Sequence, residues 1–266
     1  DLTGRQGVAM SPKAGAHGEL CGILAIKAAL DARGEDRPVI LVPESAHGTN
    51  PATAAFAGFS VENIPATPEG RVDVAALKAR LGPDVAGVMI TNPNTCGLFE
   101  RDLKIISDAV HAAGGYVYCD GANFNAIVGR VRPGDLGVDA MHINLHKTFS
   151  TPHGGGGPGS GPVVLSEALA PYGPIPFVAK MPDGSFKLVE EEAAGEMHPQ
   201  TFGRMTAFHG QMGMFTRALA YILSHGADGL RQVAEDAVLN ANYILRSLEG
   251  TLEAPFGASG PCMHEA

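Results

Sequence analysis

Short apolar runs alternate with amphipathic segments from the start of the chain to about Leu165. Seven of these runs are expected as strands: Val8–Met10, Val39–Val42, Val61–Ile64, Val85–Ile90, Tyr116–Cys119, Ala140–Asn144 and Pro162–Leu165. Between them, apolar residues recur at helical spacing in Glu19–Asp31, Val74–Leu81 and Leu103–Ala113. Asp73 is the candidate N-cap of the second of these helices. This alternation predicts an α/β fold in which a mostly parallel seven-stranded sheet is flanked by helices.

The remainder of the chain has a different pattern. An irregular, proline-rich segment is expected from Pro171 to Pro199, followed by helices over Gly203–Leu223 and Leu230–Leu248. One face of the second helix carries the apolar residues Leu230, Val233, Ala237, Ala241, Ile244 and Leu248. We therefore divide the chain into a large domain, residues 1–200, and a helical part, residues 201–266, that leads into a truncated C-terminal domain.

Composition and charge narrow the class of protein. Hydrophobic residues make up 45% of the chain, and the formal net charge is −9. Without a dense Lys/Arg run, this charge does not favour a nucleic-acid or anionic-membrane partner, and the apolar runs are too short to span a membrane. The four widely spaced cysteines favour a reducing compartment over a zinc site. Because no initiator Met opens the sequence, we expect a piece of a longer protein.

A lysine lies between the sixth apolar run and a glycine-rich loop. Lys147 follows Asn144-Leu145-His146 and precedes Gly154–Gly161. A lone lysine after a strand is commonly a solvated surface residue. Here the neighbouring glycines allow the backbone to approach a ligand closely. An amine desolvated in such a place can act as a nucleophile and form a Schiff base.

An aspartate ends the fifth apolar run and is followed by small residues. Asp120 precedes Gly121 and Ala122. Taken alone, such an aspartate is as consistent with a helix N-cap as with a ligand contact. Ligands of an open parallel sheet bind beyond the carboxyl ends of its strands, where both Asp120 and Lys147 are expected. Together they fit the lysine and the pyridinium-pairing carboxylate of a pyridoxal phosphate site.

Three further segments are expected near the same edge. Gly15 and Ala16 precede the helix expected over Glu19–Asp31, and a glycine-rich helix start can bind a phosphate through its backbone N–H groups. His47 follows the second strand and either stacks on an aromatic ring or caps the next helix. Asn92 follows the fourth strand and either donates to a ring hydroxyl or belongs to a Pro-Asn turn.

Other motifs are excluded by their context. Gly154, Gly156 and Gly159 match G-x-G-x-x-G, but a strand and not a helix is expected after them, so a dinucleotide site is not predicted. His142 and His146 lie in strand-like sequence, where a spacing of four does not form a metal pair. We therefore expect no metal site.

Five segments in this order resemble fold-type I pyridoxal phosphate enzymes. The resemblance is most specific to the P-protein family of the glycine cleavage system, glycine dehydrogenase (aminomethyl-transferring), in its carboxyl half or second subunit. It is carried by Ala14–Leu20, Ser45–Ala54, Thr91–Arg101, Asp120–Asn123 and, above all, Asn144–Pro162. The match extends over essentially the whole chain.

The resemblance implies a role for each matching position. Lys147 would hold the cofactor covalently and move protons, while Asp120 would pair with the pyridinium nitrogen. His47 would stack on the ring, and Ala122 would lie on the opposite face. Asn92 would lie near the 3′-oxygen. The residues expected around the phosphate are Gly15, Ala16, His146 and Thr148.

The activity implied by the resemblance is the decarboxylation of glycine, with transfer of the aminomethyl group to the lipoyl arm of H-protein and release of CO₂. The implied partners are lipoylated H-protein and an amino-half subunit or fused half, in a dimer or heterotetramer. Composition favours a bacterial cytoplasm, and a eukaryotic protein would belong to the mitochondrial matrix. Two alternatives remain: another fold-type I enzyme, such as a cysteine desulfurase or aminotransferase, and a non-catalytic assembly subunit.

Overall fold

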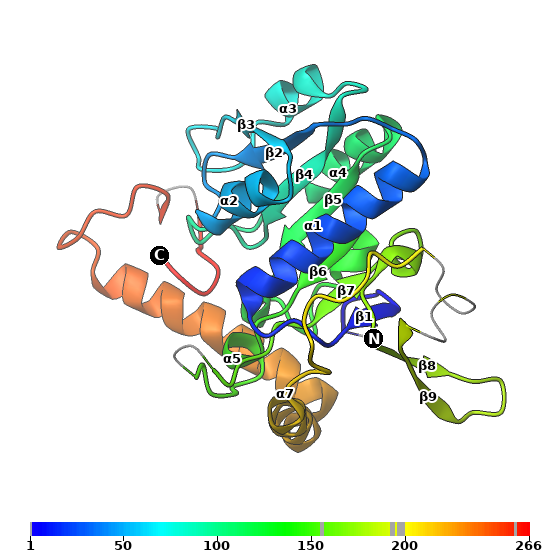
Figure 1. The fold of residues 1–266 in the computed structure, drawn as a ribbon. Helices are drawn as coiled ribbons and strands as arrows, with labels where there is room; N and C mark the ends of the chain where they lie inside the picture. The colour runs from blue at the N-terminus through cyan, green and yellow to red at the C-terminus, as the bar shows by residue number, and fades with distance from the viewer. Residues whose placement is uncertain (1, 155–156, 192–194, 196–199, 258–259) are drawn as a thin grey trace.

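A seven-stranded sheet forms the centre of the computed structural model, which describes residues 2–154, 157–191, 195, 200–257 and 260–266 (Figure 1). Its strands are β1 (Gly7–Ala9), β2 (Val39–Pro43), β3 (Ser60–Ile64), β4 (Val85–Thr91), β5 (Tyr116–Asp120), β6 (Ala140–His142) and β7 (Val163–Leu165). They lie in the order β1-β7-β6-β5-β4-β2-β3, and β7 runs antiparallel to both of its neighbours. The predicted strands and the mostly parallel sheet are therefore confirmed.

Helices cover both faces of this sheet (Figure 1). One face packs against α1 (Gly15–Ala32) and α2 (Thr49–Phe56), and the other against α3 (Val74–Arg80), α4 (Leu103–Ala112) and α7 (Met212–Ser247). Successive strand residues alternate between the two resulting cores: Ile40 lies with α1, and Leu41 lies with α4. Burial on both faces explains why the strands are continuous apolar runs.

The predicted helices are present, with shifted ends. Asp73 caps α3 as expected, because its Oδ1 accepts hydrogen bonds from the backbone N–H groups of Ala75 and Ala76. Helix α1 begins at Gly15, four residues before the predicted start at Glu19. No bounds were predicted for α2, the helix that His47 could cap, and the single-turn α5 (Leu145–Thr148) was not predicted. Both are too short and polar to show a clear period.

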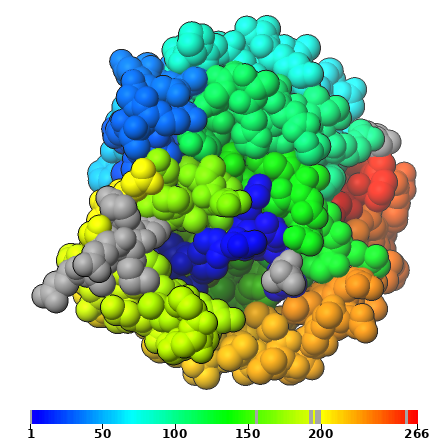
Figure 2. Space-filling model, turned by 90° about the vertical axis from the view of Figure 1, so that its right-hand side faces the viewer, coloured from blue at the N-terminus to red at the C-terminus, as the bar shows by residue number. Residues whose placement is uncertain are grey.

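The segment expected to be irregular contains a β-hairpin. Strands β8 (Phe177–Lys180) and β9 (Phe186–Val189) pair antiparallel around an Asp-Gly turn, a signal that the proline content obscured. Figure 2 shows the N-terminal strand, in blue, at the molecular surface between this hairpin and α7. The prediction was therefore wrong for these eight residues. Residues 192–194 and 196–199 of the same segment lie outside the described part of the chain.

Helix α7 differs from its prediction in where it begins and in how far its apolar face is buried. It begins at Met212 and not at Gly203, because Gly203 and Gly210 have positive φ angles. Gly226, with φ 63° and ψ −173°, interrupts it in a conformation reserved for glycine, within the gap predicted between two helices. The predicted apolar face is buried at Leu230 but exposed at Ile244, where the helix extends past the core. Within the described ranges, no helix is both long and apolar enough to cross a membrane.

Candidate functional site

The parallel strands bring the predicted site residues to one edge of the sheet. His47 follows β2, Asn92 follows β4, Asp120 ends β5 and Lys147 lies just beyond β6. Because these strands run in the same direction, their carboxyl ends lie side by side. Residues separated by a hundred positions in the sequence therefore meet at this edge.

Asp120 is the most completely organised residue of the site. Asp120 is only 2% exposed to solvent. The backbone N–H of Ala122 donates to Oδ1 at 2.9 Å, and the Asn50 amide donates to Oδ2 at 3.1 Å. Asp120 is therefore a buried acceptor held by uncharged donors, and not the helix N-cap that the sequence alone also allowed.

His142 supplies a third contact to Asp120. Its Nε2 lies 3.4 Å from Asp120 Oδ1, and its Nδ1 lies 2.5 Å from the Tyr118 hydroxyl. Burial lowers the pKa of His142 and raises that of Tyr118, so both groups are neutral at pH 7. Because a carboxylate only accepts hydrogen bonds, the neutral His142 ring carries its hydrogen on Nε2, and Nδ1 accepts from the Tyr118 hydroxyl.

The close approach of β6 to β5 is made possible by Gly121. A methyl group at this position would lie 1.9 Å from the carbonyl oxygen of His142, so no larger residue fits. With glycine there, the β6 backbone passes immediately beside the end of β5. This proximity is what brings the His142 ring within reach of Asp120.

Lys147 lies on α5, immediately beyond the strand, at the place that the sequence predicted. Its side chain is exposed, so the expected desolvation of the amine is not found in this chain. The reason is geometric: within the single turn of α5, Leu145 and Thr148 face the core and Lys147 faces outward. The amine is therefore accessible from solvent.

One of the residues expected around a phosphate, His146, lines a cavity of about 460 Å³. Ala14, at the start of α1, and His146, on α5, both line it, together with Lys13. Gly15 is buried against Asn144, and Thr148 is buried on α5 with a hydroxyl that has no partner among the described residues. Ala16 is exposed at the helix start. Gly15, Ala16 and Thr148 are not among the residues that line this cavity, and neither are Lys147, Asp120 and His47, so the phosphate site stays a prediction.

Asn92 is engaged within its own loop. Its Oδ1 accepts from the Glu100 backbone N–H at 3.0 Å, and its Nδ2 donates to the Glu100 carbonyl at 3.5 Å. Two side-chain contacts to one residue close the loop that leaves β4. One Nδ2 hydrogen is left for a ligand, so the expected contact with a ring oxygen stays a prediction.

His47 is exposed, and a network of polar groups holds its inner edge. Its Nδ1 lies 2.8 Å from the Thr49 hydroxyl, which in turn lies 2.9 Å from a carboxyl oxygen of Glu19. Glu19 is on α1 and is buried. The His47 ring is therefore held through its Nδ1, and the rest of the ring is accessible to a ligand.

The residues present fit pyridoxal phosphate. The site combines an accessible amine at Lys147, a buried carboxylate at Asp120 and, near α5, buried hydroxyl groups without partners among the described residues, including those of Thr148 and Thr151. These are the groups that such a cofactor requires for its aldehyde, its ring nitrogen and its phosphate. The helix start at Gly15 adds backbone N–H groups that no helix residue can satisfy.

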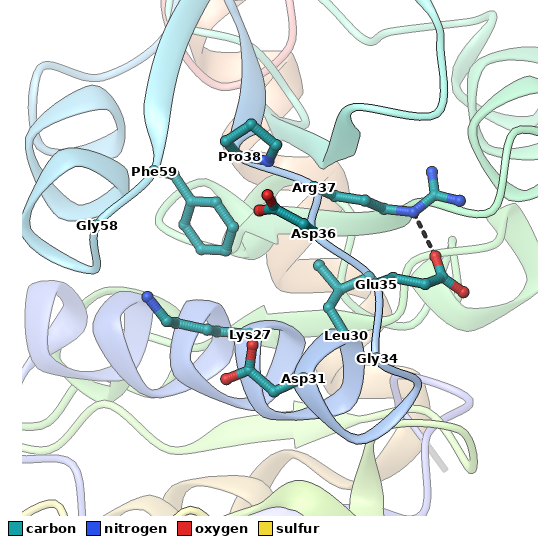
Figure 3. Close-up of a pocket in the computed structure, with 10 residues that line it drawn as sticks. All are labelled: Lys27, Leu30, Asp31, Gly34, Glu35, Asp36, Arg37, Pro38, Gly58 and Phe59. Atoms are coloured by element: carbon teal, nitrogen blue, oxygen red, sulfur yellow. Dashed lines mark hydrogen bonds and ion pairs between the residues drawn. The ribbon is translucent and has the colours of Figure 1, made fainter.

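A second hollow, of about 360 Å³, lies at the opposite edge of the sheet, between the end of α1 and the starts of β2 and β3 (Figure 3). Three of its polar side chains have partners within the protein. Lys27 donates to the Ala57 carbonyl at 2.9 Å, and Arg37 forms an ion pair with Glu35 at 2.5 Å. We assign no function to this hollow.

Residues 21–158 match the family model for class-V aminotransferases. This match covers more than half of the chain, and the chain belongs to this family. Its fold is shared with a solved glycine decarboxylase (P-protein) of the glycine cleavage system in inhibitor-bound form. The TM-score is 0.69 with 22% sequence identity, over 94% of this chain and 55% of that protein.

Among curated proteins, the chain is similar to two bacterial relatives of the same name. It is 67% identical over its full length to the probable glycine dehydrogenase (decarboxylating) subunit 2 of Caulobacter vibrioides. It is 51% identical, again over its full length, to the protein of that name in Methylococcus capsulatus. These alignments cover 50% and 53% of the relatives, so the chain spans about half of their length.

Sequence reasoning missed the residues that support Asp120. Asn50 lies seventy positions before Asp120, and nothing in their spacing predicts the contact. His142 was considered only as a metal ligand. One signal could have identified it: because Tyr118 pairs with Ala140 in the parallel register, Asp120 faces His142 two residues further along. Glu19 and Thr49 also escaped notice, although both lie within the segments that carry the family resemblance.

Proposed function

We propose that this chain is the cofactor-binding part of a glycine-decarboxylating enzyme of the glycine cleavage system. The proposed reaction removes CO₂ from glycine and transfers the remaining aminomethyl group to the lipoyl arm of H-protein. Pyridoxal phosphate is the proposed cofactor. The remaining half of the protein, a partner subunit and H-protein would complete the assembly, in a dimer or heterotetramer.

The observation that carries the proposal is the buried Asp120 carboxylate on the strand next to the Lys147 segment. A carboxylate that is 2% exposed and held by uncharged donors needs a positively charged group to face. A protonated pyridine ring is such a group. The 67% identity with a relative named as a glycine dehydrogenase subunit supports the choice of substrate. A solved plant protein of similar fold, Oryza sativa TDC, is described with PLP.

Bound pyridoxal phosphate, with its ring nitrogen protonated, would draw electrons from the bond that breaks at the substrate α-carbon. Asp120 would keep the proton on that nitrogen, since the Ala122 N–H and the Asn50 amide hold its carboxylate in place. His142 Nε2 lies beside the same carboxylate without adding charge. Lys147 Nζ would bind the cofactor covalently and, once released, take up and return a proton.

The cofactor assignment is tested by borohydride reduction of the full-length protein after addition of pyridoxal phosphate, followed by peptide mass mapping. We expect a phosphopyridoxyl adduct on Lys147. Lys13 is the matched control, because it is another exposed lysine beside the same cavity. An adduct on neither lysine in a folded protein, or an adduct on Lys13 alone, would overturn the assignment and favour an assembly subunit.

The substrate assignment needs a separate test. The full-length protein is assayed with glycine, cysteine and an α-keto acid side by side, with lipoylated H-protein present. We expect activity with glycine alone, measured as the exchange of labelled bicarbonate into its carboxyl group. Sulfur release from cysteine, or amino transfer to the keto acid, would instead identify a cysteine desulfurase or an aminotransferase.

A further inference from the structure

Glu19 is a buried carboxyl group without a charged partner. It lies in the second turn of α1 and is only 1% exposed. Its Oε2 is 2.9 Å from the Thr49 hydroxyl, while its Oε1 has no hydrogen-bond partner among the described residues. Within that part of the chain, Glu19 forms no salt bridge. Leaving a carboxylate ionised in such surroundings is costly.

The Thr49 hydroxyl connects this carboxyl group to His47. Thr49 Oγ1 lies 2.8 Å from His47 Nδ1. The backbone N–H of Thr49 also donates to Nδ1, at 3.2 Å. A ring nitrogen that accepts a hydrogen bond carries no hydrogen of its own, so Nδ1 is unprotonated.

Three arrangements of the hydrogens can be compared. If Thr49 donates to an ionised Glu19, lone pairs on Oγ1 and Nδ1 face each other at 2.8 Å. If Nδ1 instead carries a hydrogen and donates to Oγ1, that hydrogen competes with the Thr49 backbone N–H at the same nitrogen. If Glu19 is protonated and donates to Oγ1, the hydroxyl donates to Nδ1 and no like groups oppose each other. Only the third arrangement satisfies every contact.

The electrostatic surroundings agree with this arrangement. Burial raises the pKa of Glu19, and the negative charge of Asp120 on β5 adds to the effect. The polar side chains of Thr53, Thr49 and Asn50 oppose the shift without reversing it. Tyr118, the other titratable group nearby on β5, is kept neutral by its own burial.

We propose that Glu19 is a protonated positioning residue that, through the Thr49 hydroxyl, fixes the neutral His47 ring with its hydrogen on Nε2. The inference deepens the proposed function, in which His47 stacks on the cofactor. A neutral imidazole can lie against a protonated pyridine ring without charge repulsion, whereas an imidazolium cannot. The chain of hydrogen bonds itself involves protein atoms alone and requires no cofactor.

The hydrogen positions can be measured directly on the full-length protein without cofactor. Long-range ¹H–¹⁵N spectra of ¹⁵N-histidine-labelled protein distinguish protonated from unprotonated ring nitrogens, and a His47→Gln variant assigns the signals. We expect an unprotonated Nδ1 and a protonated Nε2. A hydrogen on Nδ1 in the wild-type protein would overturn the proposal.

Two pairs of variants separate the hydrogen-bond chain from general effects on folding. Thr49→Val removes the hydroxyl at similar volume and is expected to raise the share of the tautomer with its hydrogen on Nδ1, because only the longer backbone contact of 3.2 Å then favours an unprotonated Nδ1. Thr49→Ser is expected to retain the wild-type spectrum. Glu19→Gln places an amide donor where the protonated carboxyl lies, so the tautomer is expected to persist. If Thr49→Val left the tautomer unchanged in a folded protein, Thr49 would not connect the two residues.

The proton on Glu19 is tested by infrared difference spectroscopy at pH 7. Wild type minus Glu19→Gln is expected to show the carbonyl band of a protonated carboxylic acid. The matched control is Glu44→Gln, because Glu44 is an exposed glutamate close to His47 and is expected to contribute no such band. A carboxylate band from Glu19 would contradict the proposal.

A cofactor-binding measurement distinguishes this inference from the proposed function. If the proposed function and the positioning role of Glu19 are both correct, Thr49→Val weakens the affinity for pyridoxal phosphate about fivefold. This is the effect expected from one lost hydrogen bond. If the protein binds no pyridoxal phosphate while His47 shows the expected tautomer, the proposed function fails and the positioning role stands. If binding occurs with Nδ1 protonated, the positioning role fails alone.

Discussion

The two edges of the central sheet hold polar side chains in contrasting ways. At the carboxyl edge, Asp120 and Glu19 are buried, and their partners are uncharged hydroxyl, amide and imidazole groups. At the amino edge, the Glu35 carboxylate has a charged partner, Arg37, and the Lys27 amine has a backbone carbonyl (Figure 3). Both edges contain a hollow, so concavity alone does not distinguish them.

The two arrangements differ in their effect on the free energy of the folded protein. An ion pair whose carboxylate lies at the surface contributes little to the stability of the fold. Buried carboxyl groups with neutral partners are unfavourable unless a ligand or a proton compensates their charge. The carboxyl edge therefore indicates a functional site, whereas the amino edge indicates ordinary surface. Four substitutions test this contrast.

The largest expected effect is that of Lys147→Ala. Loss of the amine removes the covalent anchor for the cofactor, so glycine-dependent bicarbonate exchange should fall by about a thousandfold or more. Because Lys147 is exposed, the free energy of unfolding should change by less than about 0.5 kcal/mol. Lys27→Ala, at the amino edge, should retain full exchange activity. If both variants lost exchange activity equally, the carboxyl edge could not be identified as the functional site by this test.

A smaller loss is expected for Asp120→Asn. An amide cannot keep the ring nitrogen protonated, and the turnover of the full-length enzyme should fall by about a hundredfold. Steady-state exchange kinetics and the absorbance of the bound cofactor provide the measurement. The control is Asp31→Asn, since Asp31 lines the amino-edge hollow. Unchanged turnover in Asp120→Asn would refute the pairing of Asp120 with the ring.

Asn50→Ala tests the support of Asp120 rather than the chemistry. This change leaves Asp120 Oδ2 without the donor that lies 3.1 Å away. We expect the free energy of unfolding to fall by about 1–3 kcal/mol, measured by urea denaturation of the cofactor-free protein. Glu35→Gln, at the amino edge, should have a smaller effect, because this carboxylate lies at the surface. A neutral result for Asn50→Ala would mean that water replaces the amide.

The smallest effect concerns the pH dependence of stability. The raised pKa of Glu19 means that the folded protein binds a proton which the unfolded chain releases at lower pH. Stability should therefore decline as pH rises from the unfolded pKa, about 4.3, toward the raised folded value. The pKa of Glu35 is lowered by its hydrogen bond with Arg37, so its contribution is lost as pH falls through the folded value.

Urea denaturation at a series of pH values checks these opposite signs. Glu19→Gln should flatten the decline above the unfolded pKa, because the variant has no proton to lose. Glu35→Gln should leave that decline unchanged. If Glu19→Gln altered stability equally at every pH, Glu19 would be ionised in the folded protein, and the hydrogen arrangement proposed for His47 would also be wrong.

The sequence predicted most of the sheet because both of its faces are buried. Strands such as β2 and β4 are then continuous apolar runs, and their ends are marked by the change to polar residues. The predicted positions of Asp120 and Lys147 followed from the same rule. Elements of one or two turns, such as α5, were missed because their periodicity is too short to detect.

Contacts between distant segments limited what could be predicted about the site. Asn50 and Asp120 come from different βα units, and their meeting depends on the order of strands in the sheet, which hydrophobic patterns do not specify. The exposure of Lys147 depends on which way a single turn of helix faces. By contrast, the Asp73 cap was predictable, because it depends only on neighbouring residues.

The glycine at position 121 has a consequence for how this site can evolve. Since any side chain there would collide with the β6 backbone, a mutation library should yield glycine alone at this position, however permissive the selection. Asp120 and Gly121 thus form a unit in which the first residue provides the charge and the second provides the space. A related chain that keeps the aspartate but replaces the glycine would need a wider separation between β5 and β6. Such a chain would retain the buried carboxylate but lose its contact with His142.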